Sequence, residues 1–437
     1  MGRAAAVLAA AVVARMTFHA LFVPAFEGPD EPYHLARALA FANRPWPDAF
    51  AGAPVEPALA AAVRARPCSE NLHRVFGCPL FGAPPRRSPA RFDVLEPDPP
   101  VPVSRRALVN TEDNQPPLAY LLAGLVLRAW GAIGRPSPSS SLLVFRLLGV
   151  LCVAAALLGP LRALGRDPRR AAGLALGALL LLLTPGASEA LARASNDAPV
   201  FLWAALVVWA VKTRAGGALL IPLLAAGPLL KLTALPVAAF AVAALVDRGR
   251  PRLALGGAAA ALAVFPVQAL RGWRWGGTLE FNSAASVWAA LGGSAGATLV
   301  GLVRSSYTLI KTTFWLGEWS FFRAPRPLVA AYFLLLAAAL LLAKRRSDPH
   351  HSAAHGAAAL VAAGGFFAFA IGNRLYYGDW GGVGGWYVWT WLPWLAIAAS
   401  DLLRMERRAA TGLLVALAAF VVAANVLWFA VAWPLYG

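Results

Sequence analysis

The hydrophobic positions of the chain fall into long runs, and short segments rich in arginine separate many of them. The first run, Ala4–Val23, is close to the ~20 residues that a helix needs to cross a bilayer. Ten further runs follow, at Leu142–Leu161, Ala171–Leu191, Ala198–Val211, Ala218–Leu230, Thr233–Val246, Leu253–Leu270, Leu328–Ala343, Ala353–Ile371, Tyr387–Leu403 and Ala409–Trp433. This pattern predicts an all-α, polytopic transmembrane protein.

The basic junctions between runs predict the topology, because cytoplasmic loops carry an excess of Lys and Arg. Five junctions qualify, at Arg162–Arg170, Lys212–Arg214, Arg248–Arg252, Lys344–Arg346 and Arg404–Arg408. All five junctions face the cytoplasm if Gln115–Ile133 does not cross the membrane. This stretch is short, opens with Gln-Pro-Pro and carries Arg128. We therefore assign it to a helix that lies in the outer interface or is re-entrant. We therefore expect eleven spans in a bacterial inner membrane, with the N-terminus in the cytoplasm. Twelve spans would put Arg162–Arg170 on the wrong side.

Composition supports the membrane class. The 437 residues are 59% hydrophobic and 14% charged, and the mean hydropathy is +0.61. The net charge of +18 does not indicate a nucleic-acid partner, because the arginines cluster between apolar runs and form no continuous basic face. The first run begins like a signal peptide, but its apolar character continues through residues 16–26, so we expect an uncleaved anchor.

The outer segments in this topology are three loops, at residues 24–141, 271–327 and 372–386, and two turns, at Ala192–Asp197 and near Lys231. We expect the long first loop to bear juxtamembrane helices. The cytoplasmic loops are short, so a site must be built on the outer face. Cys68 and Cys78 flank a polar part of the first loop; they form either a disulfide in an oxidising periplasm or two free thiols.

Four polar clusters lie at the outer ends of the runs. They are Asp30-Glu31 with His34, Asn114-Gln115-Pro116-Pro117-Leu118, Arg193-Ala194-Ser195-Asn196-Asp197, and Lys231-Leu232-Thr233. Ionisable residues at membrane depth are costly and indicate function. Carboxylates and cations together suit the transfer of a sugar from a lipid phosphate, because a base must take the acceptor's proton and cations must neutralise the departing phosphate. No glycine-rich nucleotide loop is seen, which favours a lipid-linked donor.

These clusters, in this order and on one side, resemble the GT-C glycosyltransferase clan. Within that clan the chain is most similar to a bacterial family of predicted membrane proteins of unknown function that carries a Pro-Asp-Glu…His motif. The resemblance covers residues 1–246 as a catalytic core and leaves 247–437 as a variable C-terminal transmembrane region. One departure is Gly385-Trp386-Tyr387, where relatives carry Gly-Arg-Tyr; Arg374 is the candidate replacement for the missing arginine.

The resemblance also implies roles for individual residues. Asp30 matches the general base, and Glu31 matches its assisting neighbour. Asp197 would orient the donor or, together with Asp30, a divalent cation (Mg²⁺ or Mn²⁺). The substrate contacts implied or assigned on this basis are His34, Asn114, Gln115, Arg193, Asn196, Asp197 and Lys231. The expected partners are a polyprenyl-phosphate sugar and a lipid, glycan or protein acceptor.

Structural alternatives accompany each of these roles. Asp30-Glu31 and Asn196-Asp197 are also typical helix caps, and Lys231 is also typical of a lysine that extends to the membrane interface. For the whole chain, the alternatives are a polytopic transporter or lipid flippase, or a non-catalytic assembly partner. The sequence does not decide among sugars or acceptors.

Overall fold

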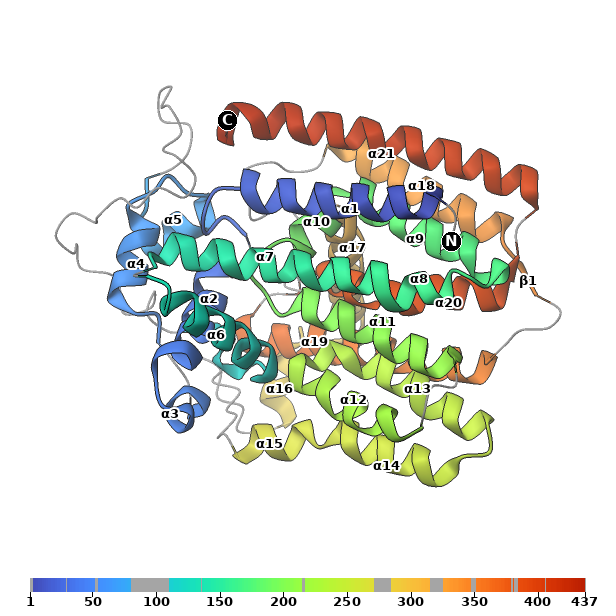
Figure 1. The fold of residues 1–437 in the computed structure, drawn as a ribbon, viewed down its shortest axis with the longest axis horizontal. Helices are drawn as coiled ribbons and strands as arrows, with labels where there is room; N and C mark the ends of the chain where they lie inside the picture. Colours follow the sequence, from blue (N-terminus) through green and yellow to red (C-terminus); the bar gives the residue numbers. More distant parts are fainter. Residues whose placement is uncertain are drawn as a thin grey trace.

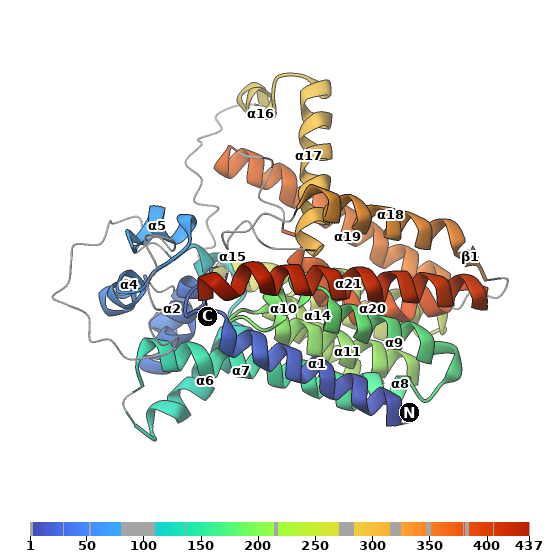
Figure 2. The same cartoon turned by 90° about the horizontal axis from the view of Figure 1, so that it is seen from above.

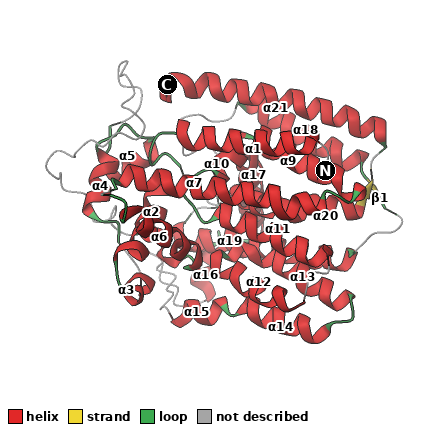
Figure 3. Cartoon of the chain, viewed as in Figure 1, coloured by secondary structure: helices red, strands yellow, loops and turns green. Residues whose placement is uncertain are grey.

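The computed structural model describes residues 3–28, 30–51, 54–79, 110–134, 136–213, 217–270, 284–314, 325–346, 351–378, 380, 384–404 and 406–436. Within these ranges the chain is almost entirely helical, and the one sheet is a short antiparallel pair, β1 (Lys344–Arg345) with β2 (Leu403–Arg404) (Figure 3). The all-α prediction is confirmed.

The helices of the described residues are as follows, in chain order. Residues 3–164 form α1 (Arg3–Phe22), α2 (Glu31–Asn43), α3 (Trp46–Ala51), α4 (Pro57–Arg64), α5 (Glu70–Phe76), the 3₁₀ turn η2 (Thr111–Asn114), α6 (Leu118–Gly131), α7 (Pro138–Ala156), the π-helical turn η3 (Leu157–Leu161) and α8 (Arg162–Leu164). Residues 168–270 form α9 (Pro168–Leu183), α10 (Pro185–Leu191), α11 (Asp197–Thr213), α12 (Gly217–Leu230), the 3₁₀ turn η4 (Leu232–Ala234), α13 (Leu235–Asp247), α14 (Pro251–Leu262) and α15 (Val264–Leu270). The remaining helices are α16 (Ala284–Ala290), α17 (Ala295–Phe314), α18 (Arg326–Leu342), α19 (Ser352–Tyr377), α20 (Trp386–Leu402) and α21 (Arg407–Tyr436).

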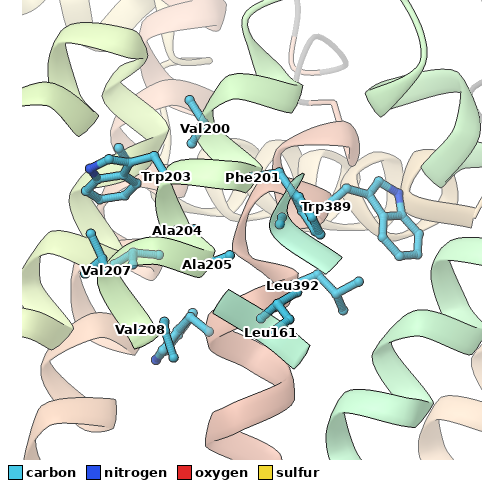
Figure 4. Packing of buried hydrophobic residues seen from close by; sticks show 14 of the residues in the cluster. Leu161, Val200, Phe201, Trp203, Ala204, Ala205, Val207, Val208, Trp389 and Leu392 are labelled. Atoms are coloured by element: carbon cyan, nitrogen blue, oxygen red, sulfur yellow. The ribbon is translucent and has the colours of Figure 1, made fainter. Parts of the chain in front are cut away.

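Helix α11 lies at the centre of the bundle. It packs against α7, α20, α12 and α13, and buried residues occur all round it. Phe201 and Val208 of α11 belong to the same buried cluster as Leu161 and Leu392, which come from η3 and α20 (Figure 4). A helix that is apolar on every side is stable only when neighbouring helices or lipid surround it.

Three helical segments among the described residues are long and apolar enough to cross a membrane, namely Pro138–Leu164, Ser352–Leu375 and Arg408–Ala430. A fourth is counted if the bent pair Gly173–Leu182 and Pro185–Leu191 forms one span. Five other apolar helices have only 10–17 residues. The structure therefore supports membrane association, while the full set of eleven spans stays a prediction.

The predicted run Ala171–Leu191 is not one straight helix. Its two halves, α9 and α10, meet at an angle of 83°. Pro185 has no N–H to donate, and Thr184 before it is extended (φ −92°, ψ 120°), as a residue preceding proline prefers. The bend carries the chain sideways into the bundle, so residues 184–197 are all buried.

The five basic junctions gather at one end of the bundle. Figure 1 shows α8, the last turns of α11 and α13, and the β1–β2 pair at the end where the N-terminus lies. The end of α1 and the start of α7 lie toward the opposite end (Figure 1). The fold therefore places the basic junctions at one end of the bundle and the segment after the first apolar run, which carries Asp30 and Glu31, toward the other end.

Two of the predicted outer loops contain helices. In the first, α2 packs along α6, and Cys68 and Cys78 form a disulfide with Cα atoms 5.9 Å apart, which decides between the two alternatives left by the sequence. In the second, α17 runs across the direction of α1 and α21 (Figure 2). Its 20 residues were expected to be loop because its polar positions interrupt the apolar pattern.

Candidate functional site

Asp197, the first residue of α11, lies at the centre of a buried ionic cluster. Lys231 Nζ donates to its Oδ1 at 2.6 Å, and Arg193 Nη2 donates to its Oδ2 at 2.8 Å. The Ser195 hydroxyl also donates to Oδ2, at 3.3 Å. All four side chains are buried. Three residues identified from the sequence therefore meet at one point, although Asp197 and Lys231 are 34 positions apart.

The local backbone explains how these side chains converge. Arg193 and Asp197 are four residues apart across the buried turn that joins α10 to α11. Lys231 occupies the break between α12 and η4 with an extended backbone (φ −167°, ψ 142°). Its ammonium is buried against Asp197, so the Lys231 side chain does not extend to an exposed surface of the protein. Asp197 binds two cations and is more than a helix cap.

Asp30 lies at the edge of the same cluster. Its backbone is left-handed (φ 59°, ψ 8°) and its side chain makes no capping hydrogen bond to α2, so the helix-cap alternative does not account for it. Burial raises the pKa of the Asp30 carboxyl; the charges of Arg193 and Lys231 lower it, and that of Asp197 raises it. The charges of Arg193, Lys231 and Asp197 therefore all act on the Asp30 carboxyl. Non-glycine residues in this conformation often occur at functional sites.

Glu31 is engaged differently from Asp30. Arg146 binds it through two hydrogen bonds, Nε to Oε1 at 2.7 Å and Nη2 to Oε2 at 2.6 Å. The backbone N–H groups of Ala194 and Gly28 each add one at 3.0 Å. The side chain is fully buried. These contacts tie the turn that carries Asp30 to α7 and to the α10–α11 turn, so the geometry gives Glu31 a positioning role where the sequence suggested a chemical one.

A buried hydrogen-bonded chain that the sequence did not reveal lies beside these acids. His34 Nδ1 contacts the Tyr120 hydroxyl at 2.8 Å, and that hydroxyl donates to Glu112 Oε2 at 3.0 Å. Since the hydroxyl donates to Glu112, His34 Nδ1 is the donor to Tyr120. Burial and the nearby charge of Asp30 raise the pKa of Glu112 to about 7. Burial, with Arg193 and Lys231, lowers the pKa of His34, so the imidazole is neutral.

The remaining predicted residues have unequal support. Asn196 is fully buried, and both polar atoms of its amide lack a hydrogen-bond partner within the described part of the chain. Such an amide is costly unless something else binds it, which suits a substrate contact. Gln115 follows η2 and its N–H donates to the Glu112 carbonyl at 3.0 Å. Asn114 ends η2, but its side chain lies outside the described residues.

Two aromatic rings from α20 cover the cations. The Lys231 ammonium lies 4.9 Å from the centroid of the Tyr387 ring, and the Arg193 guanidinium lies 5.4 Å from that of Trp386. Trp386 and Tyr387 of the Gly-Trp-Tyr sequence therefore lie against the cluster. Arg374, the candidate replacement for the missing arginine, instead donates to the carbonyl oxygens of Ala290 and Gly378.

The donor set does not suit a divalent cation. Within the described ranges, no group of three or more His, Cys, Asp or Glu side chains is arranged to hold a metal. Both oxygens of Asp197 already bind positively charged side chains, which would repel Mg²⁺ or Mn²⁺. Asp197, paired in this way, is therefore a poor ligand for the divalent cation that the resemblance allows, and the cation itself stays a prediction.

The comparisons with known proteins give no relative for this chain. No family model matches the sequence, and no curated protein or solved structure matches it.

Proposed function

We propose that the chain is a GT-C-type membrane glycosyltransferase that moves a sugar from a polyprenyl-phosphate donor to a cell-envelope acceptor. The observation that carries the proposal is the uncapped Asp30 carboxylate in a left-handed turn, which its neighbour Glu31 joins to the turn of Arg193 by accepting the Ala194 N–H, so that the charges of Arg193 and Lys231 act on it. A base next to cations is what transfer from a lipid phosphate needs.

The reaction assigns one task to each part of the cluster. The Asp30 carboxylate takes the proton of the acceptor hydroxyl, whose oxygen attacks the anomeric carbon. The bond from that carbon to the phosphate oxygen breaks, with inversion, and the electron pair leaves on polyprenyl phosphate. Lys231 and Arg193 face the charge that develops there. The step needs no metal.

Asp197 fixes the cations before the substrate arrives. An ammonium has three N–H donors, and Asp197 accepts from one of those of Lys231. Preorganised donors cost no rearrangement in the transition state, and loss of one such donor typically slows a reaction about 10²–10³-fold. Trp386 and Tyr387 offer aromatic faces on the same side of the cluster. The unpartnered amide of Asn196 is suited to a sugar hydroxyl or a phosphate oxygen.

The membrane arrangement follows from the two ends of the bundle. The basic junctions and the N-terminus share one end, which we assign to the cytoplasm, and the Asp30 cluster then faces the periplasm. The Cys68–Cys78 disulfide suits that oxidising compartment. Under this proposal the shorter apolar helices complete a multi-pass inner-membrane protein of eleven spans.

A lipid flippase or transporter is the second candidate, and two observations favour it. A helix broken at membrane depth, as between α9 and α10, is common in transporters. A second buried polar network lies toward the opposite end of α11 and α20, where Asp401 binds both Lys212 and His355. A transporter needs a gate at each end of its substrate pathway, and two polar networks at the two ends of the α11–α20 pair could form such gates.

One experiment separates the two candidates. The purified protein in vesicles receives a polyprenyl-phosphate donor labelled in the sugar. A transferase releases polyprenyl phosphate and moves the label to an acceptor fraction, whereas a flippase moves the intact donor between leaflets. Asp30→Asn should lower transfer about 10²–10⁴-fold, the usual contribution of a general base. The exposed Asp48→Asn is the matched control. Translocation without sugar release would reject the transferase.

A further inference from the structure

An apolar cavity of about 350 Å³ lies away from the Asp30 cluster, between α1, η3, α9, α11 and α20. Its lining includes Leu8 of α1, Phe201 of α11 and Leu392 of α20. Arg162, at the start of α8, is the only charged side chain among the residues that line it.

Two local features leave space between the helices at this cavity. Residues Leu157–Leu161 form a π-helical turn around Pro160, which lacks the N–H that an α-helix would use. The two ends of that turn, Leu157 and Leu161, both line the cavity. Across from them, α9 presents small residues, among them Gly177 and Ala178. A wider turn facing small side chains leaves room where two helices would otherwise touch.

The charged edge of the cavity is remote from the Asp30 cluster. Arg146, which holds Glu31, and Arg162 lie on the same run of helix, 16 residues apart; at 1.5 Å per residue the separation is about 24 Å along the axis. Leu8 and Ala9, near the start of α1, line the same region. Arg162 thus belongs to the end of the bundle where the basic junctions gather (Figure 1).

We propose that this cavity is a binding site for an anionic glycerophospholipid, with one acyl chain inside it and the phosphate on Arg162. An apolar cavity in water can stay empty, but one among apolar helices in a bilayer is surrounded by hydrocarbon chains of the right chemistry. The exposed Arg162 guanidinium offers the planar donors that bind phosphate, and basic pockets between helices are typical sites for anionic headgroups. The occupant is not the sugar donor, whose phosphate must reach Asp30 at the opposite end.

Native mass spectrometry of the purified full chain tests the site, with phosphatidylglycerol and the zwitterionic phosphatidylcholine as probes. We expect one retained phosphatidylglycerol. Ala178→Phe fills the cavity and should abolish its retention, whereas Ala14→Phe, at an exposed position of α1 outside the cavity lining, should not. Arg162→Gln should weaken phosphatidylglycerol binding about fivefold and leave phosphatidylcholine unchanged, since one cation near a lipid headgroup contributes about 1 kcal/mol. Arg166→Gln, also exposed and outside the lining, is the control.

Three results would overturn the proposal. They are equal phosphatidylglycerol retention by Ala178→Phe and the wild type, equal effects of the Arg162 and Arg166 substitutions, and recovery of polyprenyl phosphate as the bound lipid. Because Arg162 is exposed, its substitution tests the site even if the cavity-filling variant does not fold. None of these measurements depends on transferase activity, so the lipid site and the proposed function can fail separately.

Discussion

The buried pair Glu31–Arg146 should contribute more to the stability of the fold than any surface charge. The Arg146 guanidinium donates to both Glu31 oxygens and also to the carbonyl oxygens of Ala20, Val23 and Pro24, at 2.6–3.0 Å. Both side chains are almost completely buried, at 1% and 0% relative exposure. Arg146→Met therefore leaves a buried carboxylate with two backbone N–H donors but no countercharge from Arg146, and three carbonyl groups that lose this donor. Breaking a buried pair in this way costs about 3–5 kcal/mol.

The reverse substitution should be milder. In Glu31→Met the guanidinium keeps its three carbonyl acceptors, so the loss of stability should be smaller than for Arg146→Met. In the double variant neither charge remains, and its cost should fall below the sum of the single costs by about 0.5–3 kcal/mol, the range found for residues in contact. The free energies of unfolding can be measured in mixed micelles by circular dichroism. Single costs that add to within about 0.5 kcal/mol would refute the coupling.

Three further predictions concern the end of the bundle that carries Asp30. Burial raises the pKa of Glu27 from 4.5 to about 8, so between these pH values the folded chain holds a proton that the unfolded chain releases. The free energy of unfolding should therefore fall as the pH rises through this range. Glu27→Gln should flatten the profile of melting temperature against pH, and an unchanged slope would contradict this cause. Reduction of Cys68–Cys78 should lower the free energy of unfolding by about 2–3 kcal/mol, read from denaturant titrations with and without reductant, and no change would show that the loop is held by other contacts. Lys231→Met should lower the rate of sugar transfer at least about 10²-fold, while the exposed Lys344→Met should not; equal rates would remove Lys231 from the site.

The sequence predicts the helices well where apolar runs are uninterrupted, as for α11 and α13. It did not predict the bend at Pro185, although a proline inside an apolar run is the physical signal for one. It also predicted no helix over α17, because polar residues lie among the apolar ones in that segment and no continuous apolar run marks it.

In the candidate site too, the sequence identified some residues and missed others. Asp197, Arg193 and Lys231 were found because charges at the ends of apolar runs are conspicuous. Arg146 carried the same signal, a lone charge inside a run, but its partner Glu31 lies 115 positions away and spacing cannot reveal it. Glu112 was missed because it follows a long proline-rich segment with no periodicity, and only the fold brings it to His34 and Tyr120.

The most direct test of the central claim measures donor binding and sugar transfer on the same preparation of Asp30→Asn. The proposed mechanism assigns proton transfer to Asp30 and the phosphate to Arg193 and Lys231. It therefore predicts that the variant binds the polyprenyl-phosphate donor with nearly wild-type affinity and transfers its sugar about 10²–10⁴-fold more slowly. Transfer at the wild-type rate, or a loss of activity that follows entirely from lost donor binding, would contradict the claim that Asp30 is the base.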